Sequence, residues 1–192
     1  MPTPNPAALE FLQTRRSRPA KTLTTPVPDR AALMPLLEAA ARTPDHGKLE
    51  PWRFIVLERP ALLRLAAATE ARGADAGIEP ERIAKSVLQF SDAHLAVAVI
   101  SSPKPSEKIP EIEQLLSSGA VCLALLNAAL AAGWGANWLT GWMAHDPVFR
   151  REALGLSEGE TVSGFIHIGT ERAAPPERPR PDLGAITTWV TE

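Results

Sequence analysis

The side chains best suited to hold an anion form a triplet near the start of the chain, Arg15-Arg16-Ser17. Two guanidinium groups and a hydroxyl can satisfy the oxygens of a phosphate, because arginine presents paired N–H donors that match a phosphate bidentately. The triplet also stands at the end of a predicted helix, where the helix dipole stabilises basic residues without any ligand. The residues alone therefore leave two interpretations open: an anion site, or a solvated basic helix end.

A second group of polar residues lies in the stretch 41–57, where an apolar helix passes through a compact turn into an apolar strand. Pro44 and Pro51 bracket the turn, and each disfavours helix at the residue before it. His46 and Lys48 lie between the two prolines. Loops that join rigid elements often carry functional side chains, although such a turn can be polar only because it meets water.

Several other chemistries leave no signature in the sequence. The segment 133–135 is not a dinucleotide fingerprint, because position 138, where the third glycine would fall, is Trp138. Ser163 lacks the preceding glycine of a nucleophile elbow. The four histidines share no metal-ligand spacing, so no metal site is predicted. Cys122 lies in an apolar run and is predicted to be a small buried hydrophobe. No catalytic residue is predicted; the pattern indicates a protein that holds a cofactor.

Composition narrows the class of protein. The chain has 192 residues, of which 45% are hydrophobic and 22% charged, and its net charge is −2. This balance is typical of a soluble globular protein and offers no basic footprint for nucleic acid or for an anionic membrane. A single cysteine excludes disulfides within the chain and favours a reducing compartment. The amino terminus lacks the basic start and apolar core of a signal peptide, so a cytoplasmic location is expected.

The elements that must position these residues follow from apolar periodicity, caps and prolines. We expect one domain over residues 1–192, with extended arms at 1–5 and 173–192. Helices are predicted at 6–16, 29–40, 61–71, 80–90, 111–132 and 147–154, and strands at 52–57, 95–100 and 162–169. Residues 133–142 should form a strand or tight turn, 72–81 a mobile loop, and 183–192 a terminal strand. The result is an α+β protein with a mixed β-sheet flanked by helices.

The helix predicted at 111–132 is almost wholly apolar in its second half. Its apolar run, 119–135, is shorter than the roughly 20 residues of a membrane span, so a core helix is expected instead and no membrane is predicted. A helix that is apolar all round must be buried on every side, which is difficult within one small domain. We therefore expect part of this helix to form the interface of a homodimer.

The spacing of several motifs resembles that of the nitroreductase family in its small, single-domain bacterial form. Beside Arg15-Arg16-Ser17, the motifs in order are Ala41-Arg42-Thr43-Pro44-Asp45-His46, Glu50-Pro51-Trp52-Arg53-Phe54, Ser118-Gly119-Ala120, Gly133-Trp134-Gly135, Trp138-Leu139-Thr140-Gly141 and Gly164-Phe165-Ile166-His167-Ile168-Gly169. Each motif is modest by itself, but the ordered set is specific and extends over residues 9–169.

This resemblance implies a nitroreductase-like fold and a homodimer with FMN at the subunit interface. It also implies an oxidoreductase that passes hydride equivalents from NAD(P)H to nitroaromatic, quinone or related small-molecule acceptors by a ping-pong mechanism. The implied FMN-binding residues are Arg15, Arg16, Ser17, Arg42, His46, Trp138, Leu139 and Thr140, and the implied NAD(P)-binding residues are Ala128, Ala129, Leu130, Ala131, Ala132 and Gly133. Two alternatives stay open: a flavin reductase or dehalogenase on the same fold, and a non-enzymatic FMN-binding or storage protein.

Overall fold

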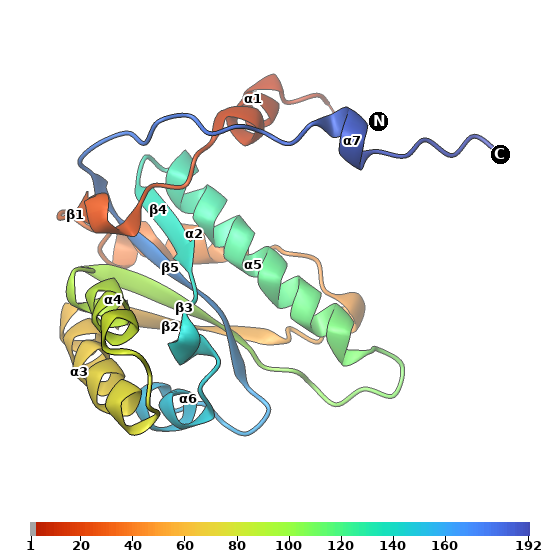
Figure 1. The fold of residues 1–192 in the computed structure, drawn as a ribbon. Helices are drawn as coiled ribbons and strands as arrows, with labels where there is room; N and C mark the ends of the chain where they lie inside the picture. Colours follow the sequence, from red (N-terminus) through yellow and green to blue (C-terminus); the bar gives the residue numbers. More distant parts are fainter. Residues whose placement is uncertain (1–2) are drawn as a thin grey trace.

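A computed structural model describes residues 3–192 of the chain (Figure 1). Its α-helices are α1 (Pro6–Thr14), α2 (Arg30–Ala40), α3 (Arg59–Asp75), α4 (Pro80–Ser91), α5 (Glu111–Ala131), α6 (Pro147–Leu154) and α7 (Leu183–Ile186). Its strands are β1 (Leu23–Thr24), β2 (Trp52–Glu58), β3 (Leu95–Ser101), β4 (Gly135–Leu139) and β5 (Thr161–Glu171). Short 3₁₀ turns occur at Ala20–Thr22, His46–Lys48 and Trp142–Ala144.

The five strands form one sheet around β5, which pairs with β1, β3 and β4, while β2 pairs with β3 at the edge. The α+β class is confirmed, but all pairings among the described strands are antiparallel rather than mixed. The predicted strand at 95–100 is confirmed as β3, and every residue of β3 is buried. This agrees with its unbroken apolar sequence, which is typical of a strand covered on both faces.

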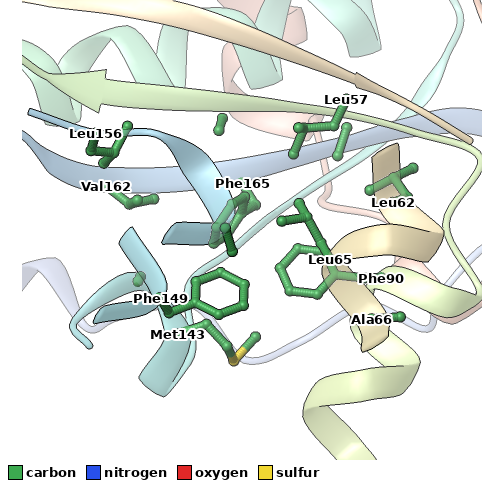
Figure 2. Close-up of a cluster of buried hydrophobic side chains, with 14 of the residues drawn as sticks. Leu57, Leu62, Leu65, Ala66, Phe90, Met143, Phe149, Leu156, Val162 and Phe165 are labelled. Atoms are coloured by element: carbon green, nitrogen blue, oxygen red, sulfur yellow. The ribbon is translucent and has the colours of Figure 1, made fainter. Parts of the chain in front are cut away.

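Two hydrophobic clusters cover the two faces of the sheet. Helices α3, α4 and α6 pack on one face, where the side chains of Leu65, Phe90, Phe149 and Phe165 point toward one another (Figure 2). The rings of Phe90 and Phe165 meet edge to face with centroids 5.2 Å apart, an arrangement that aromatic quadrupoles favour. Helices α2 and α5 pack on the opposite face (Figure 1). Burial from both sides makes the sheet a rigid platform for the loops at its ends.

Aspartate caps set the starts of two of the predicted helices. The Asp29 carboxylate accepts a hydrogen bond from the backbone N–H of Ala32 at the start of α2. Asp146 does the same for the N–H of Phe149 at the start of α6, and proline occupies the first turn there. Such caps satisfy backbone donors that have no partner within the helix. The prediction for 147–154 is confirmed.

The strand predicted at 52–57 forms, but its apolar sequence does not make it a fully buried strand. Strand β2 covers these residues, but most of them are only half-buried and Val56 is 40% exposed. The reason is topological: β2 lies at the edge of the sheet and pairs on one side only. An apolar run shows that a strand forms but not whether a neighbour covers its outer side.

The loop predicted at 72–81 is mostly helical, because α3 continues to Asp75 and α4 begins at Pro80. Gly73, read as a sign of mobility, serves packing: a Cβ there would lie 2.7 Å from Ile83 Cγ1. The predicted terminal strand at 183–192 was also wrong, since this segment holds the short helix α7 followed by unpaired chain. The first helix ends at Thr14, so Arg15 is its C-cap rather than part of its last turn.

Helix α5 is long and apolar enough, by length and composition alone, to cross a membrane. In this fold it is a core helix: Val121, Leu125 and Ala129 are fully buried against the sheet. Its opposite face carries exposed apolar residues within the chain, namely Ile112, Leu115, Leu116 and Leu123. The expected burial on every side is therefore not achieved by one chain.

Candidate functional site

The arginine triplet lies in an extended segment that is held against β4. The backbone N–H of Arg18 donates to Ala136 O at 2.8 Å, and the side-chain amide of Asn137 donates to Arg18 O at 2.6 Å. The Arg18 guanidinium pairs with Glu171 at 3.0 Å. These contacts hold Arg18, the residue after the triplet, against β4 and β5.

Two glycines make this close approach possible. Gly135 and Gly169 lie opposite each other on β4 and β5. A Cβ on Gly135 would lie 2.5 Å from Leu23 Cδ2, and one on Gly169 would lie 2.8 Å from the carbonyl oxygen of Thr24. The segment at Leu23 and Thr24 can therefore lie this close to β4 and β5 only because positions 135 and 169 have no side chain.

Among the described residues, Arg15 and Arg16 form no salt bridge, whereas Arg18 is paired with Glu171 and Arg180 with Glu177 at 2.7 Å. Arg15 Nη2 donates to Ser17 Oγ at 3.0 Å, and Arg16 Nη2 donates to the carbonyl oxygen of Pro176 at 2.7 Å. The Nε atoms of both arginines are buried without a hydrogen-bond partner. Burial lowers the pKa of Arg15, and the nearby charges of Arg180, Arg16 and Arg18 lower it further.

This arrangement fits the phosphate of a mononucleotide. Buried donors without partners are costly, and the two neighbouring arginines that lack a carboxylate partner would be stabilised by a bound anion. The side chains of Arg15 and Arg16 contact Ser17 and Pro176 rather than the last carbonyls of α1. The structure thus favours the anion-site interpretation over the basic helix end. Arg180, which the C-terminal arm contributes, was missed because nothing in the sequence links it to residue 15.

A cavity of ≈ 520 Å³ opens directly beside the arginine segment. Its lining comes from the segment after the triplet, from α4, from β4 and from β5: Pro19, Ala20, Lys21, Lys85, Leu88, Gln89, Asp92, Ala93, Asn137, Leu139 and His167. Asn137 joins the two features, because it lines this cavity and also holds the backbone of Arg18. A ligand with an anionic end at Arg15 and an apolar body could occupy both, since pockets of this kind combine apolar walls with a few fixed polar groups.

Trp138, Leu139 and Thr140 were predicted to bind FMN. Because side chains alternate along β4, Trp138 and Leu139 lie on opposite faces of the sheet. Leu139 lines the cavity on the α4 face. Trp138 lies on the α5 face, where its Nε1–H donates to Ser163 O at 3.2 Å, over Gly164. A Cβ on Gly164 would lie 2.0 Å from Trp138 Nε1, so glycine is required beneath the indole. Thr140 O accepts a hydrogen bond from the side chain of Gln89 in α4.

The polar loop after α2 lies at the other end of the sheet. His46 Nδ1 lies 2.7 Å from Glu113 Oε2 at the start of α5, and both side chains are exposed. Arg42 is exposed at the end of α2. The loop has positive φ angles at Gly47, Lys48 and Glu50, a strained conformation that is often found at functional sites.

The predicted FMN residues thus form two separate groups within one chain. The arginine group lies beside β4, which begins just after the C-terminal end of α5. His46 contacts Glu113, eighteen residues before that end, which corresponds to about 27 Å along the helix. A mononucleotide is shorter than this distance. One chain therefore does not bring all the predicted residues to one ligand.

The predicted NAD(P) residues occupy the C-terminal end of α5 and the turn after it. Ala129 is fully buried in the core, whereas 131–133 are exposed. A helix C-terminus presents carbonyl oxygens and partial negative charge, which does not favour a pyrophosphate. This assignment stays a prediction that the local geometry supports poorly.

Other reactive groups were also located. Within residues 3–192, no group of three His, Cys, Asp or Glu side chains could hold a metal ion. Cys122 is fully buried, and burial raises the pKa of its thiol to about 12. A thiol with this pKa is not a nucleophile near neutral pH.

Comparison with known proteins agrees with this fold. A Nitroreductase-like Family Protein from Bacillus cereus superimposes with a TM-score of 0.79 at 24% identity and covers 99% of this chain and 98% of its own. A putative nitroreductase from Desulfovibrio desulfuricans, solved in complex with FMN, gives a TM-score of 0.74 at 23% identity, covering 98% and 99%. The fold is therefore nitroreductase-like.

The sequence comparisons are more specific. The Nitroreductase family pattern matches residues 12–170. The Putative NAD(P)H nitroreductase YdjA of Escherichia coli (strain K12) is 36% identical over 163 residues, 85% of this chain and 87% of that protein. A Putative NAD(P)H nitroreductase of Haemophilus influenzae is 35% identical over 164 residues, 85% and 88%. The chain belongs to the nitroreductase family.

Proposed function

We propose that the protein is an FMN-dependent oxidoreductase that passes hydride equivalents from NAD(P)H to nitroaromatic, quinone or related small-molecule acceptors in a ping-pong cycle. The observation that carries this proposal is the cluster of arginines with unpartnered donors beside the ≈ 520 Å³ cavity. Family membership supports it, as do the names of the relatives and the FMN complex of the Desulfovibrio protein.

The chain's own residues would bind and orient the cofactor. Arg15, Arg16 and Ser17 would hold the phosphate, with Arg180 adding positive charge. Leu139 and the polar residues of α4 would flank the ring in the cavity. FMN, when bound, supplies the electron-transfer chemistry, while the protein contributes position and electrostatics. Lys21 at the cavity wall would favour a ring that gains negative charge, whereas Lys85 is already paired with Glu81 at 2.9 Å.

We also propose that the working unit is a homodimer, because α5 exposes apolar residues and because the predicted FMN residues lie at its two ends. A two-fold axis that packs α5 antiparallel to its counterpart would bring Arg15 of one protomer toward His46 of the other. We place this dimer in the cytoplasm. We regard residues 1–192 as one domain with arms at 1–5 and 173–192; residues 1–2 of the first arm lie outside the described part of the chain.

The test is to purify the protein and record its visible spectrum. The protein should be yellow, and the flavin released from it should comigrate with FMN on chromatography. Anaerobic mixing with NADH or NADPH should bleach the spectrum, and steady-state rates with a quinone should give the parallel double-reciprocal lines of a ping-pong order. A colourless protein that FMN cannot reconstitute would contradict the proposal. A flavin that stays oxidised for minutes with either nucleotide would identify a storage protein instead.

A further inference from the structure

His167 lies in the middle of β5, opposite Asn137 of β4, and only 2% of it is exposed. Both of its ring nitrogens are buried without a hydrogen-bond partner. The side chain lines the ≈ 520 Å³ cavity beside the arginine segment. A buried imidazole without partners is unfavourable, and a polar group of a ligand in the cavity would supply the missing partner.

The other neutral polar side chains of the cavity already have partners. The amide of Asn137 donates to the carbonyl oxygen of Arg18, and the amide of Gln89 donates to that of Thr140. These two bonds fix the backbone at the mouth of the cavity. Among the cavity-lining residues, all of which lie in the described part of the chain, His167 is the neutral polar side chain with both polar atoms unpartnered.

We propose that His167 binds the ring of the flavin, by a hydrogen bond between its imidazole and a polar atom at the edge of that ring. The inference rests on the proposed function. It gives a role in flavin binding to a residue that is not among the predicted FMN-binding residues. A neutral imidazole has one donor and one acceptor nitrogen, so it can pair with either kind of ring atom. Burial lowers the pKa of His167 to about 4, which keeps the imidazole neutral near pH 7.

The test compares His167→Leu with His167→Gln in protein stripped of flavin and then titrated with FMN or riboflavin. Loss of one neutral hydrogen bond should raise both dissociation constants by about three- to tenfold. FMN and riboflavin should weaken equally, because they share the ring and differ in the phosphate. His167→Gln keeps a donor and an acceptor and should restore most of the affinity.

A second readout separates ligand binding from a structural role. His167→Leu removes an unsatisfied buried polar group, so the thermal midpoint of the flavin-free protein should rise, by about 2–4 °C. A histidine that only stabilises the strand would give a lower midpoint. Ile168→Val is the matched control: Ile168 is also buried on β5 but packs on the α5 face, so its change should lower the midpoint and leave flavin binding intact.

Unchanged affinity of His167→Leu for both flavins would overturn the inference, as would weaker binding accompanied by a lower midpoint, which would mark a structural role. If His167→Leu does not fold, wild-type protein labelled with ¹⁵N-histidine supplies the measurement. The ring nitrogens of His167 should then shift on addition of riboflavin, and constant resonances would overturn the inference. Wild-type protein that binds no flavin at all would instead contradict the proposed function.

Discussion

Among residues 3–192, the guanidinium of Arg15 has one hydrogen-bond partner, the hydroxyl of Ser17, and three other arginines lie close by. If this group binds the FMN phosphate, Arg15→Ala removes a charge-assisted hydrogen bond. The dissociation constant for FMN should then rise about 10- to 150-fold. Riboflavin, which has no phosphate, should bind to the variant and to the wild type alike in fluorescence titrations.

Equal weakening of FMN and riboflavin by Arg15→Ala would mean that Arg15 shapes the pocket instead of binding the phosphate. No change in either would leave Arg15 as a solvated helix end, which costs only a few tenths of a kcal/mol to remove. The pair of variants Arg15→Ala and His167→Leu therefore separates recognition of the phosphate from recognition of the ring.

His167 also sets a pH dependence for the flavin-free protein. Its pKa is lowered by burial to about 4, below its value of ~6.5 in the unfolded chain. The unfolded state therefore binds more protons between these values, and stability falls as the pH is lowered from 7 toward 4. Urea unfolding should show a loss of about 2–3 kcal/mol between pH 7 and pH 4.5.

The variant His167→Leu should lose most of this slope, and a slope as steep as that of the wild type would contradict the assignment. The urea measurements should stop at pH 4.5, so that only His167 accounts for the change in stability. Below that pH a second group begins to titrate: a hydrogen bond from Arg53 lowers the pKa of Glu160 to about 2. The ionised Glu160 carboxylate stabilises the folded state, and this stabilisation is lost only as the pH falls toward the lowered pKa.

At the scale of elements, α5 divides its surface between two roles. Its inner face packs on the sheet, while Leu116 on the outer face is 66% exposed within the chain. If the outer face forms the dimer interface, Leu116→Glu should place a charge in an apolar contact and disrupt it. Sedimentation should then report a monomer near 20.6 kDa, with the helical content of the fold unchanged.

Leu63→Glu supplies the control for this change. Leu63 lies on α3 and is 47% exposed, but α3 packs on the other face of the sheet. The same substitution there should leave the oligomeric state as it is. A wild-type chain that sediments as a monomer at micromolar concentration would contradict the dimer itself.

The elements that the sequence predicted well carry local signals. Strand β3 is a continuous apolar run, and α6 begins with Asp146 as its cap followed by proline. The errors arose where the outcome depends on distant residues. Nothing in Trp52–Glu58 shows that a neighbouring strand is missing on one side, and Gly73 looks flexible until Ile83 packs against it.

The same reasoning explains which site residues the sequence revealed. Arg15, Arg16 and Ser17 could be recognised because they are consecutive and their chemistry is complementary to a phosphate. Arg180 and His167 reach the same region from the C-terminal arm and from the centre of a strand. In the sequence, His167 is one position of the strand predicted at 162–169, with no sign of a role of its own. Its unpartnered nitrogens become visible only when the surrounding atoms are placed.

At the scale of the whole molecule, the separation of Arg15 and His46 along α5 makes the proposed dimer testable by complementation. If each FMN lies between protomers, a mixed dimer of Arg15→Ala and His46→Ala chains contains one site with both changes and one site with neither. Titration of the mixed dimer should find half of the sites with wild-type affinity. If both groups of residues served the same protomer's ligand, every site would carry one change and no tight site would remain.

The contact between Arg16 and the carbonyl oxygen of Pro176 has a further consequence. It ties the beginning of the chain to the arm that carries Arg180, so the last twenty residues and the anion share the same cations. Two events that use one set of groups are thermodynamically coupled, and each changes the other by the same factor. The conformation of the C-terminal arm should therefore depend on whether a phosphate is bound at Arg15 and Arg16. Hydrogen exchange of the amides in 182–192 should respond to FMN and remain constant with riboflavin.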